Sequence, residues 1–215
     1  MSFSESDNHV LDAIMIARRS VRRFSPEVPP RNSIEKILEA GRIAPYSGAM
    51  AGVKDFRHFF VIPSPGAAIE EIKAIVLDKL RTQVAEIEPK LERHPELKAF
   101  HKRWSGQLAH GPRGVGNAPW FVVFAERKGF PPSEAQSLAF CAQNMWLKAT
   151  ALGLGYQYVS HIRNVGGDDP RLCALLGISP GEYGLGACSI GYPAQEEAFR
   201  DKPRQEPELS ARWLQ

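Results

Sequence analysis

The chain has 215 residues, of which 43% are hydrophobic and 24% are charged, and its formal net charge is +3. These values are typical of a soluble globular domain that is long enough to bury a full hydrophobic core. The mild charge excludes proteins that bind nucleic acid or anionic membranes through an overall basic surface. We expect a single domain over residues 1–215, with residues 1–9 as a flexible N-terminus.

The first half of the chain is predicted to combine helices with one strand. Apolar residues recur at helical spacing up to Arg19 and again over residues 31–44, which predicts two helices. The apolar run HFFVI, residues 58–62, predicts a buried strand. Residues 67–104 follow as a charged helical region, which its internal prolines divide into shorter helices because proline lacks a backbone N–H.

The second half of the chain is predicted to alternate strands with helices. In chain order these elements are a strand at 120–125, a helix at 133–155, a strand at 156–160, a helix at 169–178 and a strand at 185–192. Polar residues dominate the last segment, 194–215, which we expect to be an extended C-terminal arm. The order of elements predicts an α+β fold.

Several classes of protein are excluded by what the sequence does not contain. The polar start is unlike a secretory signal, and the longest apolar run, residues 118–125, is too short to span a bilayer. The histidines show no metal-ligand spacing, and the three cysteines lack a C-x-x-C motif and fit a reducing compartment. The glycine-containing stretches lack the third glycine of a dinucleotide-binding fingerprint. We therefore expect a cytoplasmic protein without a metal site or membrane contact.

The arginine-rich stretch IARRSVRRF, residues 16–24, stands where the first predicted helix ends. If the chain leaves that helix in an extended form, Arg18, Ser20 and Arg22 point to one side. A guanidinium can hold a phosphate through two parallel hydrogen bonds, and a serine hydroxyl can add another. The residues alone leave a second interpretation open, which is a solvated basic surface at a helix C-terminus.

The order of elements around this stretch resembles the FMN-dependent nitroreductase family. The similar segments are RRSVRRF, APYSGA, the strand APWFVVFA, the helix and strand AQNMWLKATALGLGYQYV, and the closing segments SIGYPA and FRDKPR. They extend from about residue 10 to about residue 204. The resemblance implies a nitroreductase-like α+β fold, in which helices flank a central, mainly antiparallel sheet and the C-terminal arm is extended.

The resemblance also implies a homodimer that binds FMN at the subunit interface. The arginine–serine stretch is expected to hold the phosphate and ribityl chain of FMN, and the backbone after the third strand is expected to approach flavin N5. The full set of expected cofactor-binding residues is Arg18, Arg19, Ser20, Arg22, Pro45, Tyr46, Ser47, Ser160, His161, Lys202 and Arg204. For Lys202 and Arg204 a solvated tail is the alternative, and the His161 imidazole equally fits a surface histidine.

At one place the sequence departs from the family. Where many members have asparagine followed by Gln-Pro-Trp, this chain has AMAG, Ala49–Gly52. The change removes polar groups near the flavin, and we expect Met50 to contribute to a more apolar and roomier acceptor surface. The helices between Glu70 and Trp104 and the loop around His110–Gly116 are expected to form the wall and lid of the acceptor pocket.

The function implied by the resemblance is that of an FMN-dependent oxidoreductase. Such an enzyme passes hydride from NAD(P)H through flavin N5 to a small organic acceptor, such as a nitroaromatic or a quinone, by a ping-pong mechanism. Because the cofactor carries out the chemistry, no side chain is predicted as a general acid or nucleophile. The alternative is a protein of the same fold that binds or sequesters flavin without turnover. Binding to nucleic acid is disfavoured, since the arginine stretch lacks interleaved aromatic residues.

Overall fold

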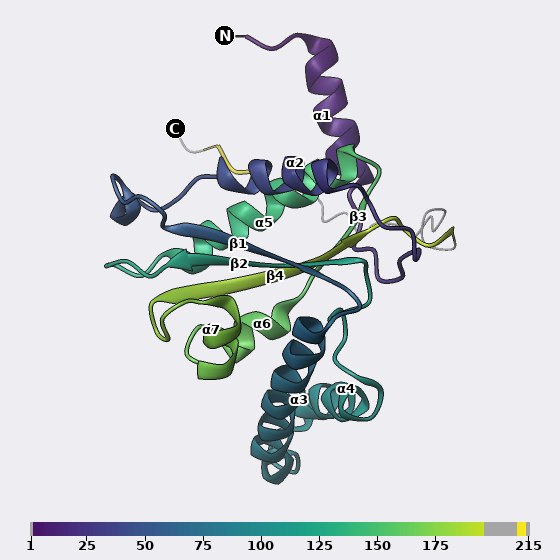
Figure 1. Cartoon of the computed structure of the whole chain (residues 1–215), viewed down its shortest axis with the longest axis vertical. Coiled ribbons are helices and arrows are strands. Elements are labelled where there is room, and N and C mark those ends of the chain that lie inside the picture. The colour runs from purple at the N-terminus through teal and green to yellow at the C-terminus, as the bar shows by residue number, and fades with distance from the viewer. Residues whose placement is uncertain (1, 196–209, 214–215) are drawn as a thin grey trace.

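A four-stranded sheet organises the described part of the chain (Figure 1), and every pairing within it is antiparallel. The computed structural model describes residues 2–195 and 210–213. The strands lie in the order β1-β2-β4-β3, with bounds β1 Arg57–Pro63, β2 Trp120–Arg127, β3 Gly155–Tyr158 and β4 Tyr183–Gly191. The predicted fold class, with a mainly antiparallel central sheet, is confirmed.

Strand β2 shows why both faces of the sheet are buried. Successive side chains of a strand point to opposite faces. Phe121, Val123 and Ala125 belong to one hydrophobic cluster, and Val122 and Phe124 belong to the other. All five are fully buried, so the uninterrupted apolar run in the sequence reflects packing on both sides of the strand.

Helices cover the two faces unequally (Figure 1). On one face lie α2 and α5, whose side chains share a cluster with β2 and β4; on the other lie α3, α4, α6 and α7. Their bounds, with that of the N-terminal α1, are α1 Glu5–Ala17, α2 Arg31–Arg42, α3 Ala67–Ile87, α4 Lys98–His110, α5 Glu134–Ala151, α6 Ser160–Val165 and α7 Pro170–Leu176. Short 3-10 turns lie at Gly48–Met50, Glu88–Lys90 and Pro95–Leu97.

The contact between α2 and α5 depends on one small residue. A Cβ atom added to Gly41 would lie 2.8 Å from Cγ of Met145 and 3.0 Å from Sγ of Cys141. Real Cβ contacts are not that short, so only glycine permits the two helices to approach this closely. This approach fixes the position of the segment that follows α2, which includes Pro45–Ser47.

Two sequence predictions about element boundaries need correction. Residues 5–9, expected within a flexible N-terminus, form the first turns of α1, because Ser4 and Asp7 make a capping box at its start. Strand β3 ends at Tyr158, so Ser160 and His161 begin helix α6 instead of ending the strand. By contrast, the division of region 67–104 at Pro89 and Pro95 is confirmed, since α3 ends before the first and α4 begins after the second.

Candidate functional site

The arginine–serine stretch is extended where it meets the edge of the sheet. The N–H of Val21 donates to the carbonyl oxygen of Tyr156 at 3.1 Å, and Ser20 forms a parallel bridge with the same residue of β3. After α1 the chain is therefore held beside β3 by one isolated parallel β-bridge and one backbone hydrogen bond. This attachment places Arg22 close to the end of β3, where α6 begins.

Arg18 and Arg19 are anchored on α5 through Trp146. The Arg18 guanidinium lies over the indole ring, 4.3 Å from its centroid, and the indole Nε1–H donates to the carbonyl oxygen of Arg19 at 3.1 Å. The Arg19 guanidinium turns back and donates to the carbonyl oxygens of Ile16 and Arg18. Arg19 thereby satisfies carbonyl groups at the end of α1, which is a structural role for part of the basic stretch.

A polar cavity of about 230 Å³ lies between α4 and the junction of β3 with α6. We call it the arginine cavity. Three of the residues predicted from the sequence, Arg22, Ser160 and His161, line it together. The remaining lining residues are Arg103, Trp104, Gln107, Arg113, Gln157, Tyr158, Val159 and Asn164. The structure thus brings Arg22 of the arginine–serine stretch and the predicted N5-contacting residues to one place.

His161 is held in its neutral form at the wall of this cavity. Its Nε2 lies 2.8 Å from Oε1 of Gln107, and the same oxygen accepts the backbone N–H of Arg113 at 2.7 Å. An amide oxygen only accepts, so His161 donates through Nε2. Burial lowers the pKa of His161, because desolvation penalises the charged imidazolium. A structural role for this imidazole therefore agrees with the geometry.

The glycine-rich loop after α4 is held against β3 by hydrogen bonds and close packing. Asn117 Nδ2 donates to Oε1 of Gln157 at 3.0 Å and to the carbonyl oxygen of Arg22 at 3.1 Å. Gly114 has a φ of +86° and approaches so closely that an added Cβ would lie 2.8 Å from Nε2 of Gln157. Because of this packing, the loop holds Arg113 at the cavity.

The segment Pro45–Ser47 does not lie at the arginine cavity. The N–H of Ser47 donates to Oγ of Ser137 at 3.2 Å, near the start of α5, whereas Arg18 and Arg19 contact Trp146 near its end. At about 1.5 Å per residue these positions are separated by about 14 Å along the helix axis. The predicted site residues therefore form two separate groups within one chain.

A buried ion pair fixes this second group. Arg57 Nη2 lies 2.7 Å from Oε2 of Glu126, and the exposed fractions of the two side chains are 3% and 0%. The same guanidinium donates to the carbonyl oxygens of Gly41, Ala44 and Pro45 at 2.8, 3.0 and 3.2 Å. Met50, expected on the acceptor surface, is instead buried within the chain, with 6% of its surface exposed.

A second, larger cavity of about 520 Å³ lies on the exposed side of α5. Small and apolar residues of the helix, including Ala135, Ala139 and Ala142, form its floor, and Tyr158 is shared with the arginine cavity. Burial raises the pKa of Tyr158, so its hydroxyl stays protonated at neutral pH. The two cavities therefore meet at one aromatic side chain.

Two of the predicted site residues lie outside the described part of the chain, and four residues that line the arginine cavity were not predicted as site residues. Lys202 and Arg204 fall within 196–209 and have no described structure. Within residues 2–195 and 210–213, no helix is long and apolar enough to cross a membrane, and no group of side chains has the composition of a metal site. Arg103, Gln107, Arg113 and Gln157 carry no motif, and only the assignment of the helices between Glu70 and Trp104 and of the loop around His110–Gly116 to the acceptor pocket pointed toward Arg103 and Arg113.

The chain is similar to known proteins both in family and in fold. The Nitroreductase family model matches residues 15–200. A nitroreductase with bound FMN from Bacteroides fragilis is 21% identical with a TM-score of 0.69, and the alignment covers 94% of this chain and 98% of that one. A BluB-like flavoprotein from Clostridium difficile is also 21% identical, with a TM-score of 0.68 and coverage of 92% and 94%.

Oxidized iodotyrosine deiodinase, bound to FMN and 3-iodo-L-tyrosine, shares the fold at 19% identity. Its TM-score is 0.62, and the alignment covers 95% of this chain and 100% of that one. Among curated proteins, no match was found. At these identities the structural similarities establish the fold, while the family match covers most of the chain.

Proposed function

Because the chain belongs to the nitroreductase family, we propose that it is an FMN-dependent oxidoreductase that uses NAD(P)H to reduce a small organic acceptor. The observation that carries the proposal is the convergence of Arg22 with the Ser160–His161 backbone in one cavity. The arginine stretch and the start of α6 are far apart in the sequence. Their convergence is what a ligand with a phosphate at one end and a polar ring at the other requires.

The residues present fit FMN by the chemistry of their donors. The guanidinium of Arg22 and the side chains of Gln157 and Asn164 offer N–H groups, and Ser20 and Ser160 offer hydroxyls. A phosphate and the carbonyl groups of a flavin pyrimidine ring both accept hydrogen bonds from such donors. Arg18, Ser20 and Arg22 are proposed to hold the phosphate and ribityl chain, and Ser160 and His161 the reactive edge.

When bound, FMN supplies the redox chemistry. It would carry two electrons between the substrates, and for a quinone acceptor the overall balance would be NAD(P)H plus the quinone plus one solvent proton giving NAD(P)⁺ and a hydroquinone. The protein residues bind and orient the reactants. His161 remains neutral beside Gln107, so it adds no charge to the cavity.

We further propose that the site is completed by a second copy of the chain. Pro45–Ser47 lie about 14 Å along α5 from the arginine stretch, and the larger cavity on α5 has the apolar floor of a surface that is covered in an assembly. A twofold dimer brings Pro45–Ser47 of one copy toward the arginine cavity of the other. The three described cysteines are buried and unpaired, which supports a reducing, cytoplasmic location.

The proposal predicts that the purified protein is yellow and prefers FMN to riboflavin. Each charge-assisted hydrogen bond to the phosphate contributes about 1.5–3 kcal/mol, so FMN should bind at least about tenfold more tightly. Flavin fluorescence quenching measures both dissociation constants, and steady-state oxidation of NAD(P)H with a quinone measures turnover. Equal affinities would contradict the phosphate assignment. Tight FMN binding without NAD(P)H oxidation would favour the non-catalytic flavin-binding alternative.

A further inference from the structure

Three arginines and no acidic residue line the arginine cavity. Arg22, Arg103 and Arg113 line it, and its lining includes no aspartate or glutamate. Within residues 2–195 and 210–213, none of these three arginines has an ion-pair partner. The Arg22 guanidinium donates only weakly, to the carbonyl oxygen of Ser20 at 3.4 Å, and that of Arg103 lies over the Phe100 ring at 5.2 Å.

An uncompensated set of charges of one sign selects against a neutral ligand. While water fills the cavity, the guanidinium groups are hydrated. A neutral molecule that displaces this water leaves the charges both desolvated and unpaired, which costs free energy. A ligand with a negative group replaces the lost hydration with charge-assisted hydrogen bonds.

The cofactor accounts for only one of the three arginines. Arg22 follows directly from the stretch that is proposed to hold the FMN phosphate. Arg103 and Arg113 come from α4 and from the loop after it, which lie across the cavity from Ser160. His161 is neutral, so it does not change the charge of the cavity. Two positive charges therefore remain beside the position proposed for the reactive edge of the flavin.

We propose that Arg103 and Arg113 bind the carboxylate of a small, flat electron acceptor, and this inference rests on the proposed function above. Trp104 and Tyr158 line the same cavity and offer aromatic surfaces to a planar molecule. The acceptor class is thus an aromatic or conjugated organic acid.

The 2′-phosphate of NADPH is a less suitable occupant of the same arginines. It lies at the adenosine end of the dinucleotide, separated from the reacting nicotinamide by two riboses and a pyrophosphate. Arg103 and Arg113 line the same small cavity as Ser160, where the backbone is proposed to face N5. An anion bound there belongs to the molecule that reacts.

The first experiment measures binding without turnover, with benzoate and its neutral analogue benzamide as probes. Both are titrated into the protein as purified with FMN, and binding is followed by calorimetry and by the change in flavin absorption. We expect benzoate to bind at least about tenfold more tightly than benzamide. Equal affinities would overturn the proposal.

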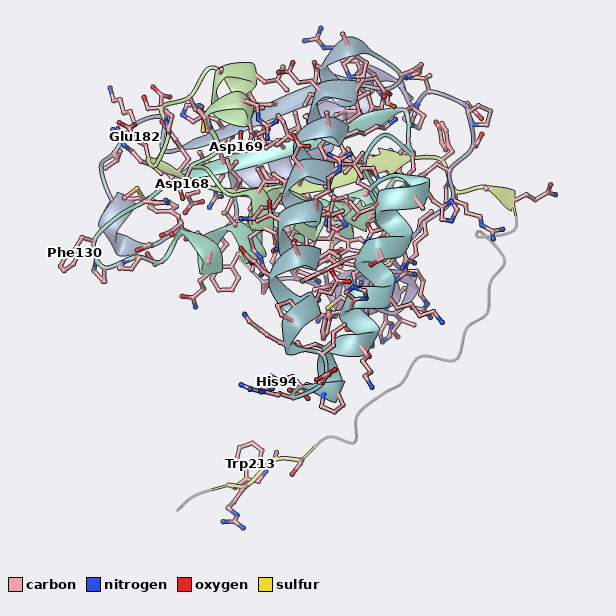
Figure 2. The ribbon with its side chains drawn as sticks, turned by 90° about the horizontal axis from the view of Figure 1, so that it is seen from below. His94, Phe130, Asp168, Asp169, Glu182 and Trp213 are labelled. Carbon is pink, nitrogen blue, oxygen red and sulfur yellow. The ribbon has the colours of Figure 1, made fainter. Side chains whose placement is uncertain are left out.

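The second experiment uses Arg103→Gln and Arg113→Gln, with Arg93→Gln as the matched control. Arg93 is exposed and neighbours His94, which lies at the far tip of the α3–α4 hairpin (Figure 2). Each cavity variant is expected to weaken benzoate binding by about 10–100-fold and to leave benzamide binding much less affected. The control is expected to match the wild type. A loss that is equal for both probes would overturn the proposal.

Turnover separates this inference from the proposed function. With 4-nitrobenzoate, one turnover oxidises one NAD(P)H and consumes one proton, and the nitro group becomes a nitroso group with release of water. We expect the two cavity variants to raise KM for 4-nitrobenzoate and not for 4-nitrobenzamide. Reduction of both at equal KM by the wild type would overturn the carboxylate site while the proposed function stands. Benzoate selectivity without any NAD(P)H oxidation would support the site and contradict the oxidoreductase.

Two further results would assign Arg103 and Arg113 to a phosphate, either that of FMN or the 2′-phosphate of NADPH, and not to a carboxylate. If Arg103→Gln or Arg113→Gln weakens FMN binding and leaves benzoate binding unchanged, the pair holds the cofactor. If the variants raise KM for NADPH, spare NADH and leave benzoate binding unchanged, the pair holds the 2′-phosphate. Either result would overturn the proposal.

Discussion

Two regions of this molecule contain arginine in opposite circumstances. Arg57 is the first residue of β1, and its almost fully buried side chain is paired with Glu126 of β2 while it also donates to three backbone carbonyl oxygens. The arginine cavity contains Arg22, Arg103 and Arg113 with no carboxylate among its lining residues. The comparison shows that the neighbours of an arginine, and not its residue type, decide whether it stabilises the fold or faces a ligand.

The physical basis of this difference is desolvation. A buried guanidinium is tolerated when a carboxylate and several carbonyl groups replace its water, and Arg57 has both. In the cavity, water can hydrate the guanidinium groups until a ligand enters. The free energy of desolvating them therefore opposes ligand binding and not folding. Substitutions in the two regions should therefore change different measured quantities.

The largest effect is expected for Arg57→Ala. It leaves Glu126 buried and charged without its partner, and removal of one partner of a buried pair costs about 3–5 kcal/mol. Urea denaturation measures the free energy of unfolding. The double variant Arg57→Met with Glu126→Leu is the control, and it should lose much less because no charge is left unpaired. A single variant as stable as the double variant would contradict this account of the pair.

A smaller effect, on binding and not on stability, is expected for Arg22→Ala. Loss of a charge-assisted hydrogen bond to the FMN phosphate should weaken FMN binding by about 1.5–3 kcal/mol, which is about 10–150-fold. Flavin fluorescence titration gives the dissociation constants for FMN and for riboflavin, and riboflavin binding should change little. Arg19→Ala is the matched variant, since that guanidinium is turned toward the carbonyl oxygens of Ile16 and Arg18. Equal losses in both variants would remove the distinction.

The smallest effect concerns pH and His161. Because burial lowers the pKa of His161 in the folded protein below its unfolded value of 6.5, the unfolded state binds more protons as the pH falls below 6.5. Stability is therefore greatest above that value and decreases as the pH falls toward the folded pKa.

His161→Gln removes the titrating group and keeps a side chain able to contact Gln107. We expect the variant to lose less stability than the wild type between neutral pH and pH of about 5.5. Thermal unfolding measured across that range gives the two slopes, and the exposed His94→Gln variant serves as control. Parallel slopes for wild type and His161→Gln would show that this histidine is protonated equally in both states.

The predictable part of the fold was the part governed by local pattern. The apolar runs at residues 58–62 and 120–125 correspond to β1 and β2, and the long apolar stripe of 133–155 corresponds to α5. Both strand and helix follow from the spacing of apolar residues along a single element. Boundaries were less predictable, and β3 ends at Tyr158 because the chain turns into α6 while Val159 still donates to the carbonyl oxygen of Ala187.

For the candidate site, too, local features were predictable from the sequence and long-range contacts were not. By itself the sequence determined that basic residues and a serine follow the first helix, because residue type and spacing are local properties. Tertiary structure alone decided that Arg18 and Arg19 contact Trp146 of α5, that Pro45–Ser47 lie at the other end of α5, and that Arg103 and Arg113 meet Ser160 in one cavity. These are contacts between segments far apart in the chain, and hydrophobic periodicity carries no information about which distant side chains meet.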